Sequence, residues 1–259
     1  MAIVDHEIDR EAPARRRAEG VAGYHCWHDL LFVHWRVEPA AVESLLPAGL
    51  SLDTYDGSAW VGIVPFSISG LRPWWFPPLP GVNVFNEINV RTYVHYRGRD
   101  PGVWFFSLDA TSRLAAQMAR WCWRLNYFFT RMRIRRTGDV VHYQAVRATN
   151  ARKAGARIVA HIGPRLGHGE PARRLPAGQT LPGTLEHFLL DRYILYACRG
   201  DGPLYRARVH HVPYCVNEVQ LMACDESLLS VAGIEVEGPP CHAAFCERAD
   251  VEVFPLRPV

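Results

Sequence analysis

The chain consists largely of short β-forming segments that alternate with turn sequences. Segment 84–96 is the clearest, because β-forming residues occupy most even positions and polar residues most odd ones. A period of two is typical of a strand whose faces meet different surroundings. Turns such as Asp56-Gly57 and 99–102 favour hairpins between neighbouring segments. Strands are expected at 31–37, 50–55, 59–69, 84–96, 103–108, 127–136, 140–149, 156–162, 193–199 and 204–212, with two or three more after residue 214.

A few short helices are expected between these strands. Segment 111–124 predicts the longest, with Thr111 or Ser112 as its N-cap and an apolar stripe on one side. Many hairpin-connected strands with few helices indicate the α+β class, mainly β, in one domain. Long antiparallel strands in this number usually close into a barrel, because closure removes exposed edges. The other helices are expected at 40–46, 185–191 and 226–231.

Charge and apolar content exclude several classes of protein. Lys and Arg total 29 against 26 Asp and Glu, and a net charge of +3 argues against a nucleic-acid partner. No apolar run reaches the eighteen or so residues of a membrane span. Residues 1–20 have no apolar core, so we expect a flexible tail and not a signal peptide. Seven cysteines cannot all pair, which favours reduced thiols and a cytoplasmic location.

The odd-numbered row of segment 84–96 holds the main candidate site. Its polar members are Glu87, Asn89, Arg91, Tyr93 and His95. An amphipathic strand commonly turns such a row to water; the alternative is that the row lines a cavity. In a cavity Glu87 can transfer protons, and Arg91 can hold a carboxylate by two parallel hydrogen bonds. We then expect Glu87 and Arg91 to form a buried or half-buried pair, and the apolar even-numbered row to pack against an outer helix.

Other groupings give weaker signals. His25, Cys26 and His28 lie together but lack a second ligand cluster at familiar spacing, so we expect no metal site. Phosphate-loop, dinucleotide and hydrolase-elbow motifs are missing from the sequence, and we expect no cofactor. The aromatic segment 74–76 is a candidate flap, subunit contact or membrane contact; we rank membrane contact last, for want of a basic amphipathic neighbour. Loop 164–183 is long enough to be functional or mobile.

Several stretches resemble a known family. They are LLFVHWRVEPAAVESLLPAGLSLDTYDGSAWVGIVPF, FNEINVRTYV, PGVWFFSLDA, FLLDRYILY and VHHVPY. Together they are similar to the YqjF-like proteins of unknown function, within the acetoacetate decarboxylase-like superfamily. The resemblance covers residues 27–259. It implies a single domain there: a cone-shaped antiparallel β-barrel with a polar interior pocket and a few outer helices.

The resemblance also assigns roles to residues. Phe85-x-Glu87 resembles the decarboxylase's Tyr-x-Glu, whose glutamate lies in the active pocket, so Glu87 is the expected catalytic residue. Arg91 and Asn89 share its face and are expected to bind substrate. His28 falls near the position of the decarboxylase's pocket arginine and is expected to join them.

One departure from the decarboxylase is large. Residues 109–115 occupy the place of its paired lysines and contain none, and the only lysine of the chain is Lys153. Segment 150–155 reads as an exposed turn, which lacks the dry surroundings that activate a Schiff-base lysine. The fold is therefore expected to carry over without the decarboxylation mechanism.

Two functions remain open at this point. One is an enzyme acting on an organic acid or carbonyl compound without Schiff-base chemistry. The other is a non-catalytic barrel that binds a metabolite. Both need a small-molecule ligand, and both leave open whether a second copy of the chain is a partner.

Overall fold

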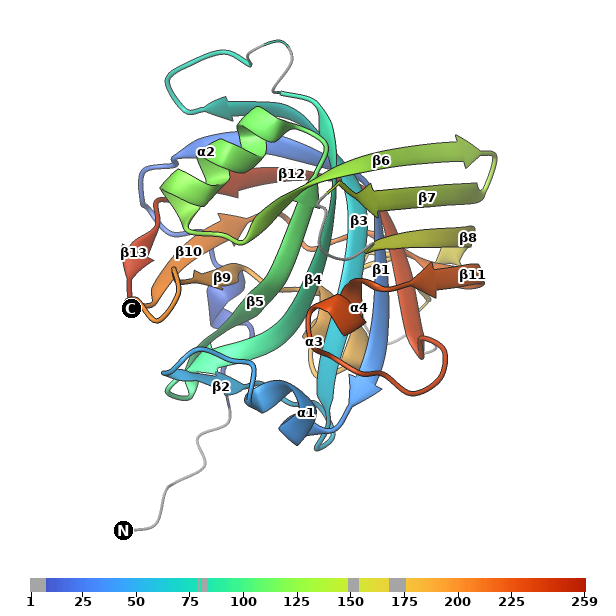
Figure 1. The fold of residues 1–259 in the computed structure, drawn as a ribbon, viewed down its shortest axis with the longest axis horizontal. Helices are drawn as coiled ribbons and strands as arrows, with labels where there is room; N and C mark the ends of the chain where they lie inside the picture. Colours follow the sequence, from blue (N-terminus) through green and yellow to red (C-terminus); the bar gives the residue numbers. More distant parts are fainter. Residues whose placement is uncertain (1–7, 79, 81–82, 149–153, 168–175) are drawn as a thin grey trace.

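The computed structural model describes residues 8–78, 80, 83–148, 154–167 and 176–259. One hydrogen-bonded sheet contains all thirteen strands of this part of the chain (Figure 1). The mainly β class expected from the sequence is confirmed. The strands are β1 Gly23–Val37, β2 Leu50–Leu52, β3 Ala59–Pro73, β4 Phe85–Tyr96, β5 Arg99–Ala110, β6 Tyr127–Thr137, β7 Val140–Arg147, β8 Gly155–Arg165, β9 Ile194–Ala197, β10 Tyr205–His210, β11 Val216–Glu226, β12 His242–Val253 and β13 Arg257–Pro258. The helices are η1 Ala12–Ala14, α1 Pro39–Glu43, α2 Arg113–Trp123, α3 Leu185–Leu190 and α4 Leu228–Val231.

The strand pairings return to their starting point. From β12 they run through β1, β3, β4, β5, β9 and β10 and back to β12. The strands are not evenly disposed about one axis. Most pairs are antiparallel, but β5 pairs in parallel with both β6 and β9. The sequence predicted a wholly antiparallel sheet, and this is wrong at β5. Its parallel neighbours β6 and β9 are reached by crossover connections and not by hairpins.

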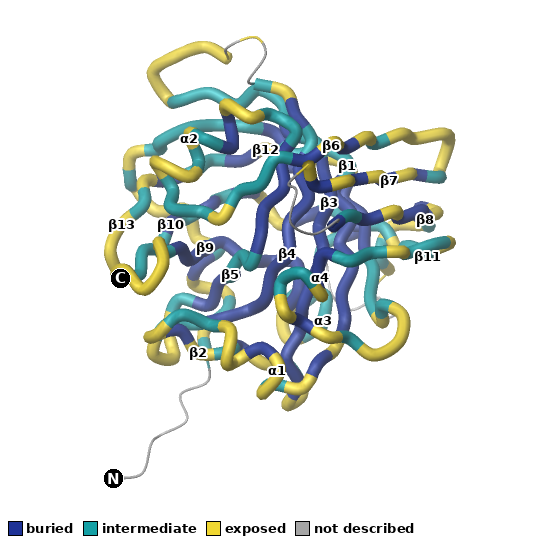
Figure 2. Tube along the Cα trace, in the orientation of Figure 1, coloured by how far each residue is buried: buried dark blue, intermediate teal, exposed yellow. Residues whose placement is uncertain are grey.

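The two faces of β4 contact two different regions, as its alternation predicted. Ile88 and Val90 lie in an apolar core with Met132 of β6, Tyr143 of β7 and Ile158 of β8. Figure 2 shows that the buried residues follow β1, β3, β4 and β5 through the middle of the molecule. We expected the whole apolar row to pack against an outer helix, and that is wrong. The core around Ile88 and Val90 combines strands with α4, Val94 packs with residues of β9, and Val84 is exposed. The opposite row of β4 faces a cavity.

The sequence predicted either Thr111 or Ser112 as the N-cap of helix α2. The Ser112 hydroxyl accepts a hydrogen bond from the Ala115 amide at 3.2 Å, so Ser112 is the N-cap. Arg124 ends the helix with φ 55°. The inner side of the helix forms part of the cavity wall, whereas Trp121 on another side is exposed. The expected packing of this helix outside a barrel stays a prediction. Among the described residues, no helix is long and apolar enough to cross a membrane.

The expected N-terminal tail is partly anchored. Residues 1–7 lie outside the described residues. The Arg10 guanidinium hydrogen-bonds the carboxylate of Asp53, which is 1% exposed, and Pro13 of η1 is buried. Arg16 pairs with Glu252 of β12 at 2.6 Å. Residues 8–20 are thus held against the sheet by ion pairs that charge patterning did not reveal.

The expected long loop, 164–183, is described only in part, since residues 168–175 lie outside the described residues. In the described part, the Gly178 amide donates to the Leu166 carbonyl at 3.1 Å. The Thr180 hydroxyl is hydrogen-bonded to Asp191, and Thr180 is buried. Residues 178–180 therefore pack against the domain.

Candidate functional site

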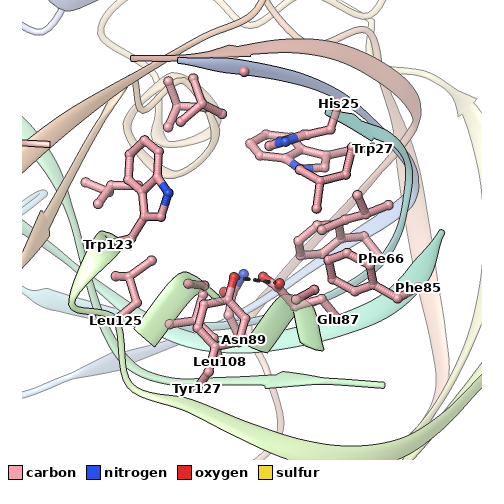
Figure 3. A pocket seen from close by; sticks show the side chains of 18 of the residues that line it. His25, Trp27, Phe66, Phe85, Glu87, Asn89, Leu108, Trp123, Leu125 and Tyr127 are labelled. Carbon is pink, nitrogen blue, oxygen red and sulfur yellow. Dashed lines mark hydrogen bonds between the residues drawn. The ribbon is translucent and has the colours of Figure 1, made fainter. Parts of the chain in front are cut away.

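A cavity of about 510 Å³ lies between the sheet and α2. Its walls come from β1, β3, β4, β5 and α2 and are largely apolar (Figure 3). The largest of these apolar side chains are Trp27, Phe32, Phe66, Phe85, Phe105 and Trp123. The volume is typical of a site for a small organic molecule. The resemblance implied a polar pocket, whereas polar groups occupy only a small part of this wall.

The polar part of the wall is the odd-numbered row of β4. Glu87, Asn89 and Arg91 all line the cavity and are buried, with Glu87 3% and Arg91 8% exposed. In Figure 3 Glu87 and Asn89 lie beside Tyr127, across the cavity from His25 and Trp27. Of the two alternatives left open by the sequence, the row facing the cavity is therefore the one observed.

Burial controls the charge of Glu87. Burial is the largest cause of a pKa raised to about 8; a hydrogen bond from Tyr127 opposes it, and the Asp109 carboxylate adds a smaller increase. The Tyr127 hydroxyl donates to Oε2 at 2.9 Å. Glu87 is therefore protonated at neutral pH and has a proton to give to a ligand.

Arg91 does not pair with Glu87, although we expected a pair. Its Nη2 donates to the Leu189 carbonyl at 2.8 Å and to the Tyr93 hydroxyl at 3.2 Å, and its guanidinium lies 5.3 Å from the centre of the Phe32 ring. Within the described residues Arg91 has no carboxylate partner, and its buried Nε has no hydrogen-bond partner. An unpaired guanidinium in an apolar wall favours an anionic ligand.

A hydrogen-bonded row behind Arg91 fixes its position. The Tyr93 hydroxyl donates to the Leu189 carbonyl at 2.8 Å and lies 2.7 Å from His34 Nε2. Because the one tyrosine proton is used, His34 Nε2 carries a proton and donates to the tyrosine oxygen. His34 Nδ1 then accepts from His242 Nδ1 at 2.9 Å. Gly62 makes room for this arrangement, since a Cβ there would lie 2.6 Å from the His34 ring.

His28 does not line the cavity, although we expected it to join Glu87, Asn89 and Arg91 there. Its Nε2 lies 2.7 Å from the Ser69 hydroxyl, and it is not part of the cavity wall. Asp29 has φ 50° and a register shift follows it, so the inward row changes from odd to even positions there. His25 faces the cavity instead, and burial lowers the pKa of its ring to about 4. Neither of its ring nitrogens has a hydrogen-bond partner among the residues that the structure describes.

Sequence reasoning missed Tyr127 and His25. Tyr127 reaches Glu87 only because β5 and β6 pair in parallel, with Leu108 opposite Tyr127. No local pattern predicts that pairing. Extending the first predicted strand back to residue 23 would not have found His25, because the register shift after Asp29 moves the inward row to odd positions there.

The wall contains no lysine among the described residues. Where the resemblance places the decarboxylase's lysine pair, Asp109 instead forms two hydrogen bonds of 2.7 Å with Arg147. Lys153 lies outside the described residues, so its expected place in a turn stays a prediction. The described residues also contain no group of three or more side chains suited to a metal ion.

Comparison with known proteins now gives the family. Residues 25–250 match DUF2071, described as "Uncharacterized conserved protein (COG2071)". The chain belongs to this family. It is 34% identical over 232 residues to "Uncharacterized protein YqjF" of Bacillus subtilis (strain 168), covering 89% of this chain and 90% of that one. The expected membership of the YqjF-like group is confirmed.

Solved structures with the same fold are acetoacetate decarboxylase-like. "Enduracididine biosynthesis enzyme MppR complexed with pyruvate" has a TM-score of 0.60 at 12% identity, covering 94% of this chain and 93% of that one. Acetoacetate decarboxylase from Legionella pneumophila has a TM-score of 0.59 at 12% identity, covering 100% and 96%. At such low identity these similarities establish the fold alone.

Proposed function

We propose that this protein is an enzyme that binds a small carboxylic acid with an apolar body, or a related carbonyl compound, in the cavity. The unpaired, buried Arg91 is the observation that carries the proposal. It would hold the ligand's carboxylate, the apolar wall would bind the body, and the strands would form the cone-shaped barrel around it. Glu87 would act as the proton donor. We also propose a cytoplasmic location, which the free state of all seven cysteines supports.

The proposed chemistry follows from the charges. A protonated Glu87 and Arg91, both in the wall of one cavity, present an acid and a cation to one ligand without repelling its carboxylate. Since Tyr127 donates to Oε2, the acid proton belongs on Oε1. In the described part of the chain the Asn89 Oδ1 atom has no hydrogen-bond partner, so it can accept from a ligand hydroxyl. Such a site suits proton transfer at a carbon or oxygen next to a carboxylate.

A binding protein without catalysis is the second candidate. It is favoured by the small number of polar groups in a cavity of this size. The two functions differ in the role of Glu87. A binding protein needs only an uncharged Glu87 side chain in the wall, whereas an enzyme needs Glu87 to transfer its proton.

Ligand binding tests the proposal. Octanoate and 3-phenylpropionate are the probes, with octanol and 3-phenylpropanol as neutral partners, measured by calorimetry at pH 7. We expect the acids to bind more tightly than the alcohols, and Arg91→Met to weaken the acids roughly tenfold to a hundredfold through loss of charge-assisted hydrogen bonds. The alcohols should be affected little. Equal affinity of acid and alcohol for the wild-type protein would contradict the role of Arg91.

Glu87→Gln separates the two candidates in the same assay. Because Glu87 is protonated at pH 7, glutamine should preserve affinity for the acids. Once native mass spectrometry of the purified protein has identified the bound ligand, an enzyme should convert it and the variant should not. Conversion at an unchanged rate by Glu87→Gln would remove Glu87 from the chemistry.

A Schiff base is not expected. Borohydride reduction in the presence of acetoacetate should leave the mass of the protein unchanged, because the described wall offers no amine. A covalent adduct on Lys153 that appears together with decarboxylation would show the opposite. Lys153→Arg is the matched control, since it keeps the charge and removes the nucleophile.

A further inference from the structure

Two separate elements expose large apolar side chains around the mouth of the cavity. Helix α2 exposes Leu114, Met118 and Trp121, at 57%, 52% and 71%. The segment after β3 exposes Trp74 and Trp75, at 63% and 67%. Leu114, Met118 and Trp75 also line the cavity, so they lie where it meets the surface. We name the set Trp74, Trp75, Phe76, Leu114, Met118 and Trp121 the mouth surface.

The apolar side of α2 extends beyond the residues that line the cavity. Its inner positions, such as Ala115 and Ala119, line the cavity, whereas Trp121 is exposed and is not part of the wall. Trp74 is likewise exposed and absent from the wall. Exposed tryptophans beyond the cavity rim are not explained by binding a ligand inside it. Clustered exposed apolar groups mark a contact surface.

The surroundings of the mouth surface are basic. Positions 113, 117 and 120 are spaced by four and three residues, so they form one narrow stripe of α2, and position 124 follows as the C-cap of the helix. Three of them are arginines, Arg113, Arg120 and Arg124. Segments 70–86 and 110–138 contain no Asp or Glu. Within the described part of the chain, none of these arginines has an acidic partner.

We propose that the mouth surface docks on an anionic lipid bilayer, so that the cavity opens toward the lipid. Tryptophan favours the boundary between headgroups and acyl chains, and α2 has the apolar side and basic stripe of a helix that lies in that boundary. From the sequence we ranked membrane contact last for segment 74–76, because we recognised no basic amphipathic segment beside it. Helix α2 is such a segment. Docking does not depend on which ligand the cavity holds.

A second copy of the chain fits this surface less well. A two-fold dimer would bring the same surface against itself. The arginines around one copy would then face those of the other without carboxylates from segments 70–86 or 110–138 to pair with them. Lipid phosphates supply the missing negative charge.

Co-sedimentation of the full chain with vesicles tests the proposal. The vesicles are phosphatidylcholine alone, or phosphatidylcholine with phosphatidylglycerol as a third of the lipid. We expect at least tenfold tighter binding to the anionic vesicles, since each arginine near such a surface contributes about fivefold. Added salt should weaken this binding. Binding that is equal on both vesicles, or absent from both, would overturn the proposal.

Matched variants locate the contact. Trp74→Ser and Trp121→Ser change exposed side chains outside the cavity wall, and together they should lower anionic-vesicle affinity at least tenfold. Met222→Ser on β11, where Met222 is 61% exposed, removes a similar apolar group elsewhere and should have no effect. An equal loss with Met222→Ser would overturn the proposal. So would a wild-type dimer that Trp121→Ser dissociates and that ignores vesicles, because a second copy would then cover the surface.

Discussion

Replacing Asp109 with alanine is expected to destabilise the folded protein by about 3–5 kcal/mol, because Arg147 would be left buried without a counter-charge. The Arg147 side chain is 6% exposed and that of Asp109 is 1% exposed. Besides its two bonds to Asp109, Arg147 donates to the Ser107 hydroxyl at 3.0 Å and stacks over Phe128 at 4.0 Å. None of these neighbours can neutralise the guanidinium. Urea unfolding at pH 7 measures the loss.

Two comparisons show whether charge is the cause. Asp225→Ala removes an exposed partner of Arg157, whose closest approach is 3.9 Å, and should cost less than about 1 kcal/mol. The double variant Asp109→Leu, Arg147→Met removes both charges and should recover most of the loss. If Asp109→Ala cost no more than Asp225→Ala, the buried pair would not be holding β5 to the end of β7.

The stability of the protein is expected to fall as pH rises from about 4.5 to about 8, through Glu87. In the folded state the pKa of Glu87 is raised from 4.5 to about 8, mainly by burial. The folded state therefore holds a proton that the unfolded state has lost across this window, and each pH unit costs stability. A shift of this size corresponds to about 4–5 kcal/mol at about 1.36 kcal/mol per unit.

Glu87→Gln should remove this dependence. Glutamine stays neutral in both states, so the variant should gain about 4–5 kcal/mol relative to the wild type between pH 4 and pH 9. Urea unfolding at several pH values measures the difference between the two proteins. Glu218→Gln changes an exposed glutamate and should run parallel to the wild type. If the wild-type and Glu87→Gln curves ran parallel as well, Glu87 would be ionised in the folded state.

The part of the candidate site that lies on a single strand was predictable from the sequence. The alternation of segment 84–96 placed Glu87, Asn89 and Arg91 on one face, and all three line the cavity. It was not predictable from the sequence that Glu87 and Arg91 do not pair, because each side chain binds a group from elsewhere in the chain instead. Tyr127 holds Glu87, and the Leu189 carbonyl holds Arg91.

The prediction fell short at His28 and at α2 for different reasons. His28 turns away because the chain bulges at Asp29, and a single extra residue moves every later side chain to the other face. Helix α2 was predicted in the right place along the chain, but its amphipathic pattern did not reveal that its inner side would meet a cavity. A hydrophobic stripe predicts that this face of the helix is covered, but it does not predict what covers it.

The order and approximate positions of most strands and helices, the family, and the residues that share the inner face of β4 could be predicted from the sequence alone. These follow from backbone periodicity and local turn chemistry, which act between neighbours in the chain. Only the tertiary structure decided that the polar row faces the cavity, that parallel pairing of β5 with β6 brings Tyr127 to Glu87, and that Arg91 stays unpaired. It also decided that Glu87 is protonated, since the charge of a carboxyl depends on how much water surrounds it, and that is fixed only when distant segments close around the site.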